Sequence, residues 1–138
     1  MTEPHAVAVI GAGPAGLATS RELGRAGVPH VVVERGAAVG HTWENLYDGL
    51  VLHTGKHLSS LPGMPFPSST PLFPTRRDFL EYLRRYAETF QLPVRTGGDV
   101  VRVTRAGTRW RVRTGSGEEY DARVVVMAPG SSRNRTSP

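Results

Sequence analysis

The sequence contains no cysteine, a single lysine and no long apolar run. Without cysteine, these residues cannot form a disulfide, a thiolate nucleophile or a cysteine-ligated metal site. The longest apolar runs, Ala6 to Ile10 and Val124 to Ala128, are far shorter than the roughly 20 residues of a membrane-spanning helix. The polar start, Met1 to His5, does not resemble a signal peptide. We therefore expect a cytoplasmic protein that makes no membrane contact.

Positive charge is supplied almost entirely by arginine, and the net charge is +5. The densest group of arginines alternates with apolar residues between Val101 and Arg113. That alternation is typical of a strand with one solvated face. No nucleic-acid-binding motif accompanies it, so we favour a solvated sheet face over a nucleic-acid surface.

The chain of 138 residues is the size of one domain. Ala6–Ile10 has the pattern of a buried parallel strand, Pro14–Ala26 that of a helix ended by Gly27, and His30–Glu34 that of a second buried strand. Together they fill about thirty residues, the size of one βαβ unit. Little regular structure is predicted from Arg35 to Pro74.

The second half predicts one more helix and several strands. Thr75 and Asp78 form a capping-box pattern at the start of a helix over residues 76–90. Strands are expected at 94–96, 100–105, 110–114 and 120–128. We predict a doubly wound α/β fold, a Rossmann-like domain with parallel strands in the order 94, 30, 6, 124 (3-2-1-4). A small antiparallel meander, from Val100 to Tyr120, is expected to cover one face.

A glycine-rich loop joins the first predicted strand to the first helix. Gly11-Ala-Gly13-Pro14-Ala15-Gly16 fits G-x-G-x-x-G, with a strand before it and a helix after it. Gly11 permits the tight turn, Gly13 lets the backbone approach a pyrophosphate, and Gly16 lets the helix pack closely on the strand. The helix N-terminus then offers N–H groups to phosphate.

An acidic residue completes this fingerprint. Glu34 lies at the carboxyl end of the second strand, where a carboxylate accepts hydrogen bonds from ribose hydroxyls and repels a 2′-phosphate. The site is therefore predicted to hold FAD or NAD rather than NADP. Arg35 is either a solvated neighbour or a partial offset to this repulsion; the sequence leaves both open.

Several later segments resemble one family of flavoenzymes. Val39-Gly-His-Thr-Trp43, then Leu50-Val-Leu-His-Thr-Gly-Lys56, then Leu61-Pro-Gly-Met-Pro-Phe-Pro67 are similar to segments of class B flavin-dependent monooxygenases. The likeness is strongest to the plant auxin-forming type and its bacterial relatives, and it covers essentially the whole chain. The resemblance implies the N-terminal FAD-binding part of such an enzyme, occupying residues 1–138 and ending before an NADPH-binding domain.

The resemblance also implies further cofactor contacts. Trp43 would line the FAD site, Val100 would border the adenine, and Gly130 would end the last strand near the cofactor. His53 either faces the flavin or is an ordinary loop histidine. Pro129 stands where the family has threonine in an A-T-G sequence, which removes one backbone N–H.

In the family, NADPH reduces FAD, and O2 bound as a flavin C4a-hydroperoxide gives one oxygen atom to a small-molecule substrate. No second glycine loop for NADPH follows Arg35 here, and no residue is proposed as catalytic or metal-binding. We therefore expect this chain alone to be inactive. The alternative is a non-catalytic FAD-binding remnant, or one half of a split protein whose NADPH-binding half is separate. A further alternative, an FAD-dependent disulfide reductase, shares the opening βαβ unit but needs a redox cysteine pair. The sequence contains no cysteine, which argues against this alternative.

Overall fold

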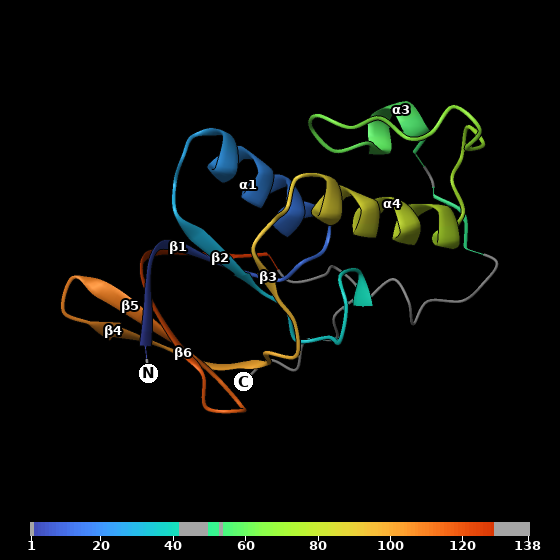
Figure 1. The fold of residues 1–138 in the computed structure, drawn as a ribbon. Coiled ribbons are helices and arrows are strands. Elements are labelled where there is room, and N and C mark those ends of the chain that lie inside the picture. The colour runs from blue at the N-terminus through green and yellow to red at the C-terminus, as the bar shows by residue number, and fades with distance from the viewer. Residues whose placement is uncertain (1, 42–49, 53, 129–138) are drawn as a thin grey trace.

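The structure, a computed structural model, describes residues 2–41, 50–52 and 54–128 (Figure 1). One six-stranded sheet runs through it in the order β3-β2-β1-β6-β5-β4. In chain order the elements are β1 (Thr2–Ile10), α1 (Pro14–Arg25), β2 (His30–Val33), α3 (Lys56–Ser59), α4 (Arg76–Thr89), β3 (Val94–Arg95), β4 (Val100–Ala106), β5 (Arg109–Thr114) and β6 (Glu119–Met127).

The parallel part of the sheet has the predicted order. β3, β2, β1 and β6 are neighbours and run parallel, as expected for a doubly wound domain. The prediction for the meander needs a correction, because it foresaw a four-stranded sheet with a separate cover. β5 and β4 are instead hydrogen-bonded onto β6 and continue the same sheet.

The meander strands also fold over one face of the parallel strands, so the expected cover is present. Alternating side chains of β1 point to opposite faces. Val7 and Val9 pack in the cluster that contains Leu17 of α1 and the buried residues of α4. Ala8 and Ile10 pack in a second cluster with Val112 and Tyr120 of the meander. Figure 1 shows α1 and α4 on one side of β1 and β2, and the meander on the opposite side.

β1 begins four residues earlier than the sequence pattern predicts. Its first part, from Thr2 to His5, pairs with β6, whereas pairing with β2 begins at Val7. Pro4 is tolerated there because a proline without an N–H can lie in a strand where one edge needs no hydrogen bond. The residues of this extension are polar or proline, so the apolar pattern of the sequence does not predict it.

The capping box predicted at the start of α4 is present: Thr75 Oγ1 accepts from Asp78 N, and Asp78 Oδ2 accepts from Thr75 N.

The Leu61–Pro67 segment is held against α4 by tyrosine hydroxyls. The Tyr82 hydroxyl accepts from Leu61 N and donates to Met64 O.

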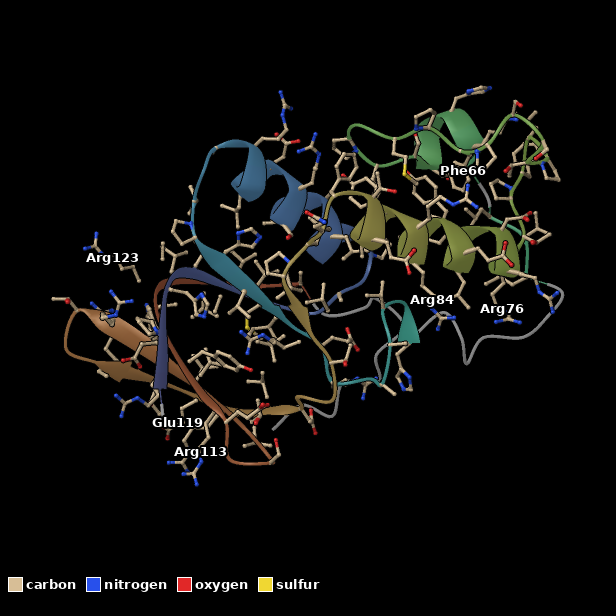
Figure 2. The ribbon with its side chains drawn as sticks, viewed as in Figure 1. Phe66, Arg76, Arg84, Arg113, Glu119 and Arg123 are labelled. Carbon is tan, nitrogen blue, oxygen red and sulfur yellow. The ribbon has the colours of Figure 1, made fainter. Side chains whose placement is uncertain are left out.

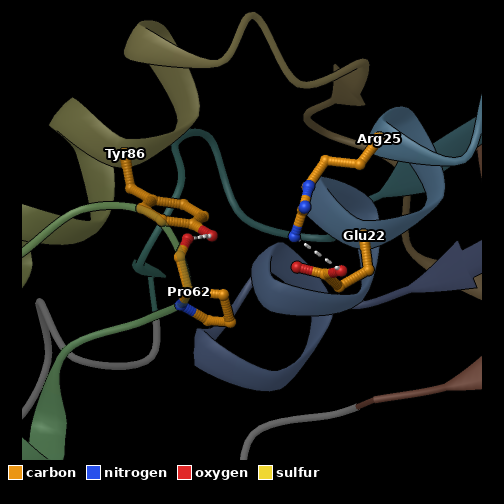
Figure 3. A network of polar contacts seen from close by, with 4 residues as sticks. All are labelled: Glu22, Arg25, Pro62 and Tyr86. Carbon is orange, nitrogen blue, oxygen red and sulfur yellow. Dashed lines mark hydrogen bonds and ion pairs between the residues drawn. The ribbon is translucent and has the colours of Figure 1, made fainter.

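A second tyrosine, one turn further along α4, adds to this contact. The Tyr86 hydroxyl donates to Pro62 O, as Figure 3 shows beside the Glu22–Arg25 ion pair of α1. Burial is the main reason that the pKa of Tyr86 rises from 10.0 to about 12. The Phe66 ring stacks on Tyr82 with ring centroids 4.1 Å apart, and Figure 2 shows Phe66 above α4. This segment, irregular by sequence, is therefore fixed by specific contacts.

Candidate functional site

The turn between β1 and α1 has the geometry that its glycines predict. Gly11 has φ of 111°, a conformation that favours glycine, and its N–H donates to Val33 O at 2.8 Å. A Cβ added to Gly16 would stand 1.9 Å from the Gly11 carbonyl oxygen. The start of α1 therefore lies directly against the end of β1, at a distance that only glycine permits.

Gly13 faces open space. It is the N-cap residue of α1, and a Cβ added to it would meet nothing within 4 Å. Its φ of −87° is open to any residue, so neither strain nor crowding of the protein itself requires glycine there. No side chain caps the helix, and Pro14 occupies its first turn, with Ala15 exposed beside it. The N-terminal N–H groups of α1 thus keep the capacity to bind an anion.

Glu34 follows β2 directly and is buried, with 6% of its surface exposed. Its Oε1 accepts from the N–H of Ala12 at 2.8 Å, and its Oε2 accepts from the N–H of Gly36 at 2.7 Å. Its main chain is fixed as well: its N–H donates to Arg95 O, and its carbonyl accepts from Gly98 N. The carboxylate is therefore joined to the glycine loop itself, a contact that the sequence did not predict.

The remaining predicted site residues divide into two groups. Arg35 is exposed beside Glu34, and Val100 is half-buried against the apolar cluster beneath the meander. Trp43, His53 and Gly130 lie outside the described residues, so their roles stay predictions. The structure thus brings together Gly11, Gly13, Pro14, Ala15, Gly16 and Glu34 at the carboxyl ends of β1 and β2.

Sequence reasoning missed three residues at this site. Ala12 and Gly36 donate to the Glu34 carboxylate, and Gly98 is buried where a Cβ would stand 3.0 Å from Val33. Bonds from a side chain to the N–H two residues on are typical of Asp, Asn, Ser and Thr, so a glutamate at position 34 carried no local signal for its bond to Gly36. The contact with Ala12 spans twenty-two residues and had no such signal.

Several arginines of the meander contact side chains or backbone groups on other strands of the sheet. Arg111 pairs with Asp121 at 3.1 Å, and this hydrogen bond raises its pKa. Arg109 donates to His5 O, and Arg105 lies over the Trp110 ring at 5.0 Å from its centroid. Figure 2 shows Arg113 and Glu119, cross-strand partners, at the lower edge of the meander. The alternation thus builds a mixed-charge sheet face.

The described residues contain neither a metal-binding cluster nor a membrane-spanning helix. No group of three or more His, Asp or Glu side chains in this part of the chain could hold a metal ion. None of the described helices has the length and apolar character needed to cross a bilayer.

The sequence was compared with models of known protein families. The model described as pyridine nucleotide-disulphide oxidoreductase matches residues 8–136, which include the glycine loop and Glu34. The chain belongs to this family. The match covers most of the chain, and the sequence contains no cysteine.

Individual relatives point to one branch of the family. The chain is 43% identical over 136 residues to a probable indole-3-pyruvate monooxygenase, YUCCA9, of Arabidopsis thaliana, covering 94% of this chain and 32% of that protein. Among solved structures, a flavin-containing monooxygenase from Stenotrophomonas maltophilia superposes with a TM-score of 0.88 at 35% identity, covering 92% and 38% of the two chains. An oxidized steroid monooxygenase bound to NADP gives 0.88 at 29% identity, covering 99% and 28%.

These matches confirm the resemblance drawn from the sequence. The chain corresponds to the N-terminal FAD-binding part of class B flavin-dependent monooxygenases. It spans about a third of the length of the curated relatives that it matches. The activity of a whole enzyme is therefore a separate question from the identity of this domain.

Proposed function

We propose that this chain is the FAD-binding part of an NAD(P)H-dependent flavoprotein monooxygenase, an oxidoreductase acting on a small-molecule substrate with O2. The single observation that carries the proposal is the open space at Gly13, between a loop closed by Gly11 and Gly16 and an uncapped helix N-terminus. A pyrophosphate is the group whose size and charge suit that place.

The residues present fit the cofactor. The pyrophosphate of FAD would lie against Gly13 and the first turn of α1, where Pro14 contributes no N–H and Ala15 leaves room. The adenosine ribose would lie against Glu34, whose two carboxylate oxygens each accept one backbone N–H and retain lone pairs for hydroxyl donors. Val100, at the start of β4 and half-buried, is the proposed neighbour of the adenine.

Cofactor identity follows from charge. A 2′-phosphate would have to approach the Glu34 carboxylate, and like charges in a buried place repel strongly. The exposed Arg35 keeps its guanidinium in water and screens little of this repulsion. The site therefore favours an unphosphorylated ribose, as FAD and NAD have, over NADP.

Flavin supplies the redox and oxygen chemistry in such enzymes, while the protein binds and orients it and excludes water. The described residues of this chain contribute the binding and the orientation of the cofactor. We propose that NADPH binds to a second part, in the same longer protein or a separate one, because one glycine loop holds one dinucleotide. Val124 and Met127 of β6, 51% and 62% exposed, are apolar residues that such a part could cover.

The second candidate function is FAD binding without catalysis, in a remnant or a subunit of a split protein. It is supported by the share of its curated relatives that the chain spans, about a third of their length. A cytoplasmic location, expected from the sequence, stays a prediction.

One assay distinguishes the two proposed functions. The FAD-loaded chain is mixed with NADPH under anaerobic conditions, and bleaching of the flavin absorbance is followed against free FAD. We expect no bleaching above the rate for free FAD, because nicotinamide must be held against the flavin and such positioning supplies about 7–11 kcal/mol of the barrier. A relative's NADPH-binding half, supplied separately, should raise the rate if the monooxygenase proposal is right. Fast bleaching by the chain alone would show that no second part is needed.

A further inference from the structure

We propose that Glu34 is a positioning residue for the phosphate-binding loop, in addition to accepting the ribose of a bound dinucleotide. Its carboxylate fixes the loop in the conformation that receives pyrophosphate, and it does so through the Ala12 and Gly36 N–H groups. This inference rests on the proposed function and adds to it a second task for the same side chain.

The first observation is the path of the contact. Ala12 lies in the loop between β1 and α1, whereas Glu34 directly follows β2, twenty-two residues later. The Ala12 N–H donates to Glu34 Oε1 at 2.8 Å. Ala12 is fully buried between Gly11 and Gly13. Leaving a buried N–H without an acceptor is unfavourable, so this N–H needs Glu34 or water. The carboxylate therefore holds the Ala12 N–H against the residue that follows β2.

The second observation is the number of anchors behind the carboxylate. The carboxylate can hold the loop in place only if Glu34 itself is fixed, and three hydrogen bonds fix it. Gly36 N–H donates to its other oxygen, Arg95 accepts from its N–H, and Gly98 donates to its carbonyl. The loop after β2 is also held by a bond from Gly97 N to Gly36 O. Glu34 thus transfers the rigidity of two parallel strands to a glycine-rich loop that would otherwise be free to adopt several conformations.

The third observation is the lone-pair count. An ionised carboxylate offers about four acceptor positions, and two are used by Ala12 and Gly36. The two that remain match the two hydroxyls of an unphosphorylated ribose. One side chain can therefore hold the loop and the ribose at once, without exchanging one contact for the other.

The two tasks predict opposite results with a ligand that has no ribose. Inorganic pyrophosphate contacts the loop but not the ribose site. If Glu34 served the ribose alone, Glu34→Gln would leave pyrophosphate affinity unchanged, or raise it by removing a nearby negative charge. If Glu34 positions the loop, its loss weakens pyrophosphate binding despite that electrostatic gain, because the amide side chain offers one acceptor oxygen for two N–H donors.

The experiment measures inorganic pyrophosphate and FAD binding by calorimetry for the parent, Glu34→Gln and Glu34→Asp. Both variants are compared at a temperature where circular dichroism shows them folded. Glu81→Gln, an exposed carboxylate of α4, is the matched control. We expect pyrophosphate affinity to fall about ten-fold in Glu34→Gln, as for loss of one charge-assisted hydrogen bond. Glu34→Asp keeps the charge but shortens the side chain, and it should fall similarly.

Unchanged or tighter pyrophosphate binding by both variants, with FAD binding reduced, would overturn the positioning role and leave the ribose role intact. If the parent binds neither FAD nor pyrophosphate, the proposed function itself is wrong. The parent supplies a further readout that needs no variant. Without ligand, the Ala12 and Gly36 amide protons should exchange slowly with solvent. Exchange as fast as that of Gly107, in the exposed β4–β5 turn, would contradict the inference even if both Glu34 variants failed to fold.

Discussion

Gly16 lies so close to Gly11 that a methyl group on it would stand 1.9 Å from the Gly11 carbonyl oxygen. The contact is with backbone, so no side chain can rotate away to relieve it. Helix α1 is thereby set against the end of β1, and this approach places the helix N-terminus beside Gly13.

Gly16→Ala should destabilise the fold. The added methyl must push α1 away from β1, and overpacking of this kind costs about 1–3 kcal/mol or more. Urea denaturation followed by circular dichroism measures the loss. The matched control is Gly24→Ala in the same helix, where a Cβ meets nothing within 4 Å. That variant should gain up to about 1 kcal/mol from helix propensity. Equal stability of the two variants would contradict the close approach.

Gly13→Ala should lose FAD binding with little effect on folding. Its Cβ would enter the open space that we assign to the pyrophosphate, while its backbone conformation suits alanine. Its unfolding midpoint should stay close to that of the parent, and FAD should no longer be retained after gel filtration. FAD retained equally by Gly13→Ala and the parent would remove the phosphate assignment.

Much of this arrangement could be predicted from the sequence, because its signals are local. The glycine spacing, the apolar strand His30–Val33 and the Thr75–Asp78 capping box all report on neighbours a few residues away. The contacts that could not be predicted are long-range hydrogen bonds. Ala12 to Glu34 and Tyr86 to Pro62 each join segments more than twenty residues apart. A tyrosine on an apolar stripe predicts burial, but the partner of its hydroxyl depends on the tertiary fold.

Tyr86 should make stability depend on pH in the alkaline range. Its pKa is 10.0 in an unfolded chain and about 12 in the fold, mainly through burial. A raised pKa means that the folded state binds the proton more tightly, so its stabilisation is complete below pH 10 and is lost as pH rises toward 12. Tyr86→Phe should be about 1 kcal/mol less stable at neutral pH, through loss of the bond to Pro62.

The variant should also lose less stability than the parent between pH 10 and 12. Denaturant titrations at several pH values measure the difference. Tyr82→Phe serves for comparison, because the pKa of Tyr82 is also raised by burial. Parallel pH profiles for the parent and Tyr86→Phe would show that Tyr86 ionises no differently in the folded chain.

Glu34 should select against a phosphorylated ribose. NAD is expected to displace bound FAD more effectively than NADP, because the 2′-phosphate would meet the buried carboxylate. Fluorescence of released FAD measures both competitions. Arg35→Ala is the control, and it should leave the preference unchanged because its side chain is exposed. A preference for NADP in the parent, lost in Arg35→Ala, would transfer the selectivity to Arg35.

The most direct test of FAD binding is the thermal unfolding midpoint of the chain with FAD and with NAD. A ligand that binds only the folded state raises the midpoint as its concentration increases, with about 2.7 kcal/mol of stabilisation at one hundred times its dissociation constant. We expect a concentration-dependent rise with FAD that exceeds any rise with NAD, and no rise with FAD in Gly13→Ala. A midpoint unchanged by saturating FAD but raised by NAD would contradict the assignment of this domain to a flavin.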